Sequence, residues 1–307
     1  NYLRYCPPGE DQPDGVLRKG IKLWGPEMSK EGSMPTFQFE ELLNDEKELY
    51  KWLVTLVTRT GIAKVENAQK EKGQLRILGQ RVGYLMQTSY GLLPEVKAFS
   101  EHSTHEVGYS DSYLPIHSDY SFNQIVPMVG MFHCIEQTKS EGGANLWVDA
   151  FHAANLLFEE DPELFEALVN TPVLFCNFTK TMVGKVYGRS RHPLIRLDHD
   201  KKVQQACYSD EFRHNHMPLE PKLMKSFYKA YYRYSELLAD KRTFFWHKMM
   251  PGDIMTINNY RVLHGRSEFN DRSDNVRILE LGYFDWDCVY SKIRILAEKQ
   301  KMPSPVD

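Results

Sequence analysis

Three residues in two short segments have the types and spacing of a metal site. His117 and Asp119 flank Ser118, and His264 stands in a second apolar segment, directly before an expected turn at Gly265. Because alternate residues of a strand point to one face, we expect the imidazole of His117 and the carboxylate of Asp119 to converge. Two histidines and one carboxylate form the facial triad of non-haem iron(II) oxygenases, which leaves positions for a bidentate cosubstrate and O₂. The sequence therefore predicts an Fe(II) site at His117, Asp119 and His264.

An arginine shortly after the third ligand strengthens this prediction. Arg277 begins a segment rich in aliphatic residues, so we expect it on a strand that is not wholly exposed. A cosubstrate with a free carboxylate requires a fixed guanidinium group, whose bidentate geometry lysine does not offer. A His-x-Asp pair alone is a weak signal, and a zinc hydrolase with the same three ligands is an alternative. Against the hydrolase, the sequence has no HExxH segment to supply a general base.

These residues require a scaffold of strands with helices beside it. Apolar residues at helical spacing predict helices, and shorter runs of β-branched and aromatic residues predict strands. The Gly142-Gly143 turn predicts a hairpin in which residues 144–148 pair with residues 124–137. Together the segments indicate an antiparallel double-sheet roll with helices on one face. The expected helices are residues 39–59, 68–87, 150–169 and 221–238, and the expected strands are 62–65, 124–137, 144–148, 254–257, 260–263 and 277–283.

Composition and charge argue against several classes of partner. A chain of 307 residues, 42% of them apolar, can bury a substantial core in one large or two small domains. The net charge of −3, with no stripe of basic residues, argues against nucleic acid as a partner. No apolar run approaches the roughly 18 residues that a membrane helix needs. Five scattered cysteines without a CxxC pair favour reduced thiols in a cytosolic or organellar compartment over disulfides or a zinc site.

Further segments match one family, in order, along nearly the whole chain. They are Leu49-Tyr50-Lys51-Trp52-Leu53, Thr60-Gly61-Ile62, His117-Ser118-Asp119-Tyr120, His133-Cys134-Ile135-Glu136-Gln137-Thr138, Pro251-Gly252-Asp253, Arg261-Val262-Leu263-His264-Gly265-Arg266 and Gly282-Tyr283-Phe284-Asp285-Trp286-Asp287. On these segments the chain resembles the γ-butyrobetaine and trimethyllysine hydroxylases of carnitine biosynthesis, within the broader group of taurine-dioxygenase-like oxygenases. The Asp-Trp-Asp segment and the residues that follow it are closer to the butyrobetaine branch.

The resemblance implies a fold, cofactors and an activity. The expected fold is α+β, with a double-stranded β-helix (jelly-roll) core flanked by helices. Fe(II) is expected at the triad and 2-oxoglutarate at Arg277, together with Asn145, which stands where relatives carry Thr or Ser. The chain is then expected to be a 2-oxoglutarate-dependent dioxygenase that uses O₂ to hydroxylate an unactivated C–H bond of a small trimethylammonium substrate such as γ-butyrobetaine.

The resemblance also implies a domain organisation. Animal relatives carry an N-terminal zinc-binding domain and form homodimers. Residues 1–35 are therefore expected to be a linker from such a domain, and residues 36–307 the catalytic domain. Structural zinc would then belong only to a domain outside this sequence. We expect a homodimer in the cytoplasm, with mitochondria as the alternative compartment.

The family recognises a trimethylammonium group with a box of aromatic side chains, since this group has no N–H to donate. The matching positions are Tyr90, Tyr109 and Tyr283. A tryptophan that completes the box in relatives is absent, and Pro94 or a neighbour stands there. Whether Phe99 or Tyr113 replaces it is left open.

The other end of the substrate pocket also departs from the butyrobetaine branch. Glu106 stands where that branch has an asparagine facing the substrate carboxylate, and trimethyllysine hydroxylases have an acidic residue there. The segment that usually supplies a second asparagine contains Ser209 and Asp210, which adds negative charge. A carboxylate facing a substrate carboxylate is repulsive. The substrate is therefore γ-butyrobetaine itself, with Glu106 solvated, or trimethyllysine or another small amine or amino acid with a positive or neutral far end.

Two alternatives in function remain. One is an oxygenase of the same fold that desaturates or rearranges an unrelated metabolite, which the altered aromatic box favours. The other is a catalytically silent binding protein, against which the complete triad and Arg277 argue.

Overall fold

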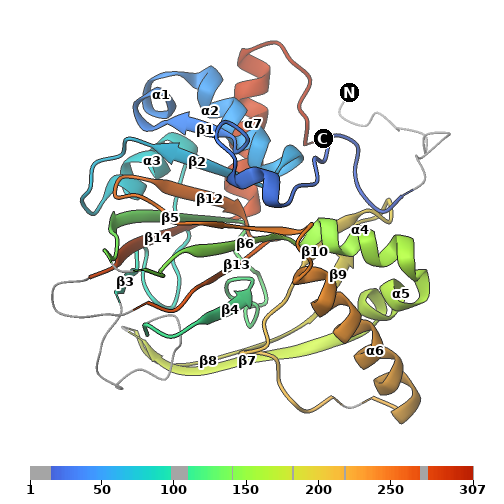
Figure 1. Cartoon of the computed structure of the whole chain (residues 1–307). Helices are drawn as coiled ribbons and strands as arrows, with labels where there is room; N and C mark the ends of the chain where they lie inside the picture. The colour runs from blue at the N-terminus through green and yellow to red at the C-terminus, as the bar shows by residue number, and fades with distance from the viewer. Residues whose placement is uncertain are drawn as a thin grey trace.

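Most of the apolar segments form strands in two sheets that pack face to face (Figure 1). The computed structural model describes residues 15–97, 110–139, 141–181, 183–217, 219–269 and 276–306. The larger sheet has six strands, in the order β1 (Thr36–Gln38), β2 (Ile62–Glu66), β12 (Ile254–Asn258), β5 (Val129–Glu136), β14 (Ile278–Phe284) and β3 (Glu95–Lys97). The smaller has four, in the order β11 (Phe244–His247), β6 (Asn145–Asp149), β13 (Val262–Arg266) and β4 (Leu114–His117).

Both faces of the larger sheet are covered, which explains the nearly continuous apolar run in β5. Side chains alternate along the strand. Phe132 and its register partner Met255 belong to the cluster between the two sheets, together with Trp147 of the smaller sheet. Met131 points the other way and packs with Trp52 and with residues of the outer helices. The chain is therefore α+β, with one core between the sheets and another beneath the helices.

Four of the described helices pack over the outer face of the larger sheet, and three more lie beside the smaller one (Figure 1). Asp45 and Asp161 each divide a region expected to be one helix, because each side chain accepts hydrogen bonds from backbone N–H groups that begin a second helix. The helix expected at residues 221–238 is confirmed, and the last helix of the chain was not expected. The helices are α1 (Phe39–Asn44), α2 (Glu46–Val54), α3 (Gln74–Val82), α4 (Ala150–Glu160), α5 (Pro162–Asn170), α6 (Pro221–Leu238) and α7 (Trp286–Lys299).

The hairpin expected at Gly142-Gly143 is wrong. β6 lies between β11 and β13 of the smaller sheet, whereas β5 pairs with β12 and β14 of the larger one. The diglycine segment instead carries the chain from one sheet to the other. A Cβ atom at Gly142 would lie 2.1 Å from the carbonyl oxygen of Glu268, so only glycine allows this close crossing. A long hairpin that was not expected, β7 (Pro172–Thr181) with β8 (Gly184–Pro193), forms a separate two-stranded sheet, and β9 (Ile195–Leu197) with β10 (Val203–Ala206) forms another.

The described part of the expected N-terminal linker, residues 15–35, packs against the body. Trp24 is 2% exposed and joins the cluster between the sheets. Its backbone N–H donates to the carboxylate of Asp149, which forms a buried ion pair with Arg261. Arg261 in turn donates to the carbonyl oxygen of Lys22. This segment is thus tied into the fold, and a domain boundary at residue 35 stays a prediction. Among the described residues, no helix is long and apolar enough to span a membrane.

Candidate metal centre and cosubstrate pocket

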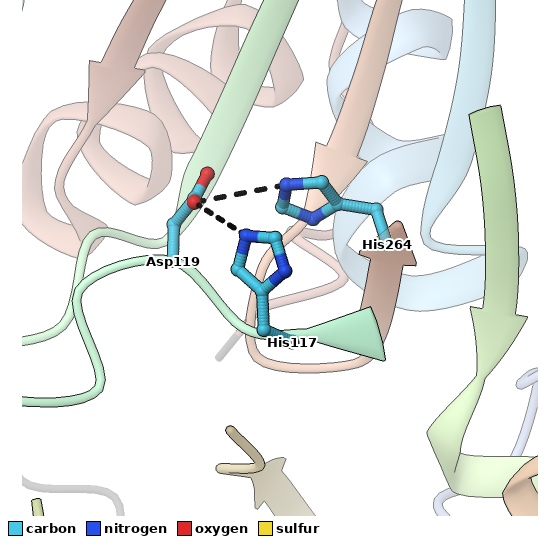
Figure 2. Close-up of side chains that lie close together, drawn as sticks. All are labelled: His117, Asp119 and His264. Carbon is cyan, nitrogen blue, oxygen red and sulfur yellow. Dashed lines mark ion pairs between the residues drawn. The ribbon is translucent and has the colours of Figure 1, made fainter. Parts of the chain in front are cut away.

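The three side chains predicted as metal ligands converge at one end of the smaller sheet (Figure 2). His117 is the last residue of β4, and His264 lies directly opposite it in β13. The Nε2 atoms of His117 and His264 lie 3.5 and 3.6 Å from Oδ1 of Asp119. The two imidazole rings are 4.4 Å apart between centroids. Oδ1 of Asp119 thus faces both imidazoles from one side, with one possible ligand atom from each residue directed at the same point (Figure 2).

Strand alternation, which was expected to bring His117 and Asp119 together, does not explain their convergence. β4 ends at His117, so Asp119 lies in the following turn rather than on the strand. Its backbone N–H donates to Oδ1 of Asn259, whose Nδ2 donates back to the carbonyl oxygen of Asp119. Gly265 lies within β13 and not in a turn. A Cβ atom there would lie 2.6 Å from the carbonyl oxygen of Leu114, so glycine allows β4 to approach.

The protonation states suit a divalent cation. Nδ1 of His117 lies 2.9 Å from the carbonyl oxygen of Pro115, so Nδ1 carries the hydrogen and Nε2 presents its lone pair. Burial lowers the pKa of His264 to about 4, which keeps this imidazole neutral. Burial alone would raise the pKa of Asp119, but the facing imidazoles of His264 and His117 and the hydrogen bond from the hydroxyl of Tyr283 lower it to about 2, so the carboxylate is ionised. Burial acts to lower the pKa of His117, but the adjacent carboxylate of Asp119 raises it, so a bound cation competes with a proton at this imidazole. Two imidazoles and one carboxylate are the donor set that Fe(II) takes in facial-triad oxygenases.

A pocket opens beside the triad, and one end of it contains two buried arginines. Arg277 and Arg266 both line it and are 3% and 2% exposed. Arg277 donates to Oδ1 of Asn145 at 3.2 Å, whereas its Nε has no hydrogen-bond partner. Burial lowers the pKa of Arg277 to about 9, and the neighbouring charge of Arg266 acts in the same direction. A dianion with one carboxylate at Arg277 would offset this unfavourable burial of positive charge, so the predicted cosubstrate site fits 2-oxoglutarate. Arg266, as a residue of this pocket, was missed by the sequence analysis.

The other end of the pocket is a continuous aromatic wall. Tyr120 lies at its centre, with ring centroids 6.0 Å from Tyr90, 5.2 Å from Tyr283 and 5.8 Å from Phe122. Phe212 extends the wall, 4.9 Å beyond Phe122. Of the predicted box, the structure therefore brings Tyr90 and Tyr283 together, and it adds three rings that the sequence analysis did not assign.

The remaining box residues fall into three groups. Tyr109, Glu106 and Phe99 lie outside the described residues. Pro94 lines the pocket as expected, but Tyr113 does not and is half exposed. The place of the missing tryptophan is therefore not taken by Tyr113, and Phe122 and Phe212 supply aromatic surface from other segments.

Comparison with known proteins identifies the family. Residues 19–281 match the family model of the taurine catabolism dioxygenase TauD, TfdA family. The chain belongs to this family. This dioxygenase is 32% identical to the γ-butyrobetaine dioxygenase of Homo sapiens over 280 residues, which covers 90% of this chain and 69% of the relative. It is 27% identical to the mitochondrial trimethyllysine dioxygenase of Bos taurus, with 85% and 61% covered.

Solved structures of iron oxygenases share the fold of this dioxygenase. The non-haem iron oxygenase OrfP, in complex with Fe and alpha-ketoglutaric acid, superposes with a TM-score of 0.61 at 12% identity, covering 82% of this chain and 94% of that one. Asparagine oxygenase in complex with Fe(II), 3-hydroxyasparagine and succinate gives a TM-score of 0.59 at 13% identity, covering 80% and 83%. Together with the family match, these findings identify a 2-oxoglutarate-dependent dioxygenase that uses iron.

Two predicted substrate contacts of this dioxygenase do not lie in the described lining of the pocket. Ser209 is buried and pairs through its backbone with His117. The carboxylate of Asp210 accepts hydrogen bonds from Arg213 and from the hydroxyl of Tyr231, so it turns away from the pocket. The next residue, Glu211, lines the pocket instead. The acidic character expected of this segment is therefore supplied one residue later.

Replacing Arg277 by Gln is expected to raise the KM for 2-oxoglutarate by roughly 10- to 100-fold, because a charge-assisted bidentate contact is lost. The dissociation constant of Fe(II), measured anaerobically without cosubstrate, should change much less. The exposed Arg242→Gln is the matched control and should leave both values unchanged. An unaltered KM for 2-oxoglutarate in Arg277→Gln would contradict the assignment.

Proposed function

We propose that this dioxygenase hydroxylates an unactivated C–H bond of a small trimethylammonium compound related to γ-butyrobetaine, with Fe(II) held by His117, Asp119 and His264. The observation that carries the proposal is the arrangement of one pocket, in which the triad separates buried arginines at one end from an aromatic wall at the other. The first end suits a dicarboxylate and the second an apolar cation. The γ-butyrobetaine and trimethyllysine dioxygenases among its relatives support the same substrate class.

The net reaction converts substrate, 2-oxoglutarate and O₂ into hydroxylated product, succinate and CO₂, with one oxygen atom entering the product and one entering succinate. Bound Fe(II) supplies the activation of O₂ that protein side chains cannot provide. Arg277 binds the distal carboxylate of the cosubstrate, and Asn145 orients the guanidinium. Phe132 and Leu279, which also line the pocket, exclude water beside the cosubstrate. No side chain is required as a general acid or base.

Tyr283 has two roles in this proposal. Its ring forms part of the aromatic wall, and its hydroxyl donates to Oδ2 of Asp119 at 2.9 Å. The hydrogen bond occupies the oxygen that faces away from the two imidazoles and leaves Oδ1 for the metal. Partners of this kind fix the orientation of metal ligands. Tyr283 thus contacts the substrate cation and orients a metal ligand at the same time.

The two facing sheets further support a double-stranded β-helix as the catalytic core of residues 36–307. We infer from the family that a linker precedes it and that the protein forms a homodimer. The bovine relative is named as a mitochondrial enzyme, which supports the mitochondrial alternative over the cytoplasm for this chain.

The proposed activity is tested by supplying Fe(II), 2-oxoglutarate and O₂ together with γ-butyrobetaine, N-trimethyllysine or matched dimethylamines that lack the quaternary charge. We expect a trimethylammonium compound to gain the mass of one oxygen and to stimulate succinate formation. Turnover of the dimethylamines alone, or of a compound without an amine, would contradict the substrate class and favour the oxygenase of an unrelated metabolite.

The aromatic wall gives a separate prediction. Replacing Tyr90 by Leu is expected to raise the KM for the trimethylammonium substrate about tenfold, because a cation–π contact in a desolvated pocket contributes about 1–2 kcal/mol. Tyr90→Phe keeps the ring and removes the hydroxyl, which accepts a hydrogen bond from Nδ2 of Asn177, so its KM should stay near that of the wild type. Equal changes in the two variants would mean that the hydroxyl, and not the ring face, is the important group.

A further inference from the structure

The aromatic wall continues beyond the tyrosines that suit a trimethylammonium group. Phe122 lies 5.8 Å from Tyr120 between ring centroids, and Phe212 lies 4.9 Å from Phe122. Both phenyl rings line the pocket, and neither carries a polar group. If the three tyrosines of the wall hold the cation, the two phenylalanines are left for the remainder of the substrate.

The first strand of the hairpin β7–β8 fixes the position of Phe212. The N–H of Cys176 donates to the carbonyl oxygen of Phe212 at 2.8 Å, and the N–H of His214 donates to the carbonyl oxygen of Leu174 at 2.8 Å. The backbone on both sides of the Phe212 ring is therefore hydrogen-bonded to the edge of β7. This pairing holds the ring at a defined place in the pocket.

The second strand of the same hairpin fixes the position of Phe122. Gly188 of β8 faces this ring so closely that a Cβ atom at Gly188 would lie 2.4 Å from Cδ2 of Phe122. The hydroxyl of Ser190 donates to the carbonyl oxygen of Ser121, the residue before Phe122, at 2.9 Å. Glycine at position 188 therefore allows the phenyl ring to lie against the hairpin, and a larger residue would push it toward the pocket.

Among the described lining residues, this end of the pocket offers no cation to a substrate carboxylate. Arg266 and Arg277, the two arginines of that lining, lie at the cosubstrate end. The neighbouring Arg213 is paired with Asp210 at 3.1 Å, and Glu211 is engaged in an interaction within the protein. A buried carboxylate without a positive partner is unfavourable, whereas a hydrocarbon group gains free energy by burial against the two phenyl rings.

We propose that Phe122 and Phe212 form a subsite for an uncharged, apolar far end of the substrate. The pocket then favours a trimethylammonium compound that ends in a hydrocarbon group over one that ends in a carboxylate. The inference rests on the proposed function and specifies its substrate class. Burial of one methylene group at such a surface favours binding about fourfold. Because the hairpin holds both rings, the subsite is formed before the substrate binds, and little ordering opposes binding.

The test measures succinate formation and oxygen incorporation with γ-butyrobetaine and with butyl-, pentyl- and hexyltrimethylammonium as substrates. For the wild type we expect KM to fall about fourfold for each methylene added from the butyl to the hexyl compound. We also expect kcat/KM for hexyltrimethylammonium to exceed that for γ-butyrobetaine, whose far end is a carboxylate.

Two variants and a control assign the effect to the phenyl rings. Phe212→Ala should make KM nearly independent of chain length and leave KM for the butyl compound little changed. Gly188→Ala, which pushes Phe122 toward the pocket, should raise KM for the hexyl compound on the order of tenfold and that for the butyl compound much less. Phe178→Ala is the matched control, because this ring lies on the same hairpin but is 71% exposed, and it should leave the series unchanged.

Other outcomes overturn the inference in distinguishable ways. If γ-butyrobetaine is turned over but KM for the alkyl compounds does not depend on chain length, the subsite is wrong and the proposed function stands. A higher kcat/KM for γ-butyrobetaine than for every alkyl compound would mean that the far end binds a carboxylate. Equal behaviour of Phe212→Ala and Phe178→Ala, both folded by circular dichroism, would mean that Phe212 does not contact the substrate. If no trimethylammonium compound stimulates succinate formation while slow basal formation persists, the proposed substrate class fails and this inference fails with it.

Discussion

His264→Ala is expected to abolish 2-oxoglutarate turnover and to weaken Fe(II) binding by more than 100-fold. His264 is 5% exposed and supplies a neutral imidazole from the middle of β13. Its loss leaves two protein ligands two residues apart in one segment, His117 and Asp119. The effect should exceed the roughly 10- to 100-fold cost of changing an outer partner of a metal ligand. Anaerobic Fe(II) titration and succinate formation measure the two effects separately.

His199→Ala is the control for this variant. His199 lies between Asp198 and Asp200 in a second cluster of possible ligand atoms, but its side chain is 84% exposed. Asp198 in that cluster is bonded to Arg18 and to backbone N–H groups. We therefore expect His199→Ala to leave Fe(II) binding and turnover unchanged. Loss of activity in His199→Ala with retention in His264→Ala would move the metal centre to the other cluster.

The largest expected effect on stability comes from breaking the buried pair of Asp149 and Arg261. Their side chains are 0% and 1% exposed, and Arg261 donates from Nε at 2.9 Å and from Nη2 at 2.7 Å. Asp149 also accepts the N–H groups of Trp24 and of Phe151 at the start of α4. Removing one partner of a buried pair leaves the other charge uncompensated. Asp149→Ala should therefore lower the free energy of unfolding by about 3–5 kcal/mol, measured in urea.

The exposed ion pair of Arg233 with Glu160 provides the comparison. Both side chains are 38% exposed, and their atoms approach to 2.7 Å. Exposed pairs contribute little because solvent screens them, so Arg233→Ala should change the free energy of unfolding by at most about 1 kcal/mol. If Asp149→Ala were as mild as Arg233→Ala, the N-terminal segment and α4 would not depend on the buried carboxylate, contrary to the structure.

The metal centre could be predicted because its signals are local. His117 and Asp119 are two residues apart, and His264 and Arg277 each stand in or beside an aliphatic strand. Even so, Asp119 reaches its position through Asn259, a contact between segments 140 residues apart, and not through strand alternation alone. The residue types indicated the site, whereas its exact geometry depends on tertiary hydrogen bonds.

Sheet pairing and the substrate end could not be predicted in this way. The sequence of β6 is compatible with pairing to β5 across the diglycine turn. In the folded chain β6 instead pairs with β11 and β13, which are distant in sequence. The aromatic wall combines Tyr120, Phe122 and Phe212 from two distant segments. An aromatic residue in a turn carries no sequence signal that distinguishes a pocket wall from ordinary core packing. The choice between the neighbouring residues Asp210 and Glu211 depends on how their turn is oriented, which the sequence does not show. The sequence analysis therefore selected Asp210, whereas Glu211 lines the pocket.

The central claim is tested most directly by loading the protein anaerobically with Fe(II) and 2-oxoglutarate, admitting O₂, and measuring succinate and CO₂. We expect both products in equal amounts, only when Fe(II) and 2-oxoglutarate are both present, and faster when a trimethylammonium compound is added. An absence of succinate from folded protein that has bound Fe(II) would contradict the account, and would favour a catalytically silent binding protein.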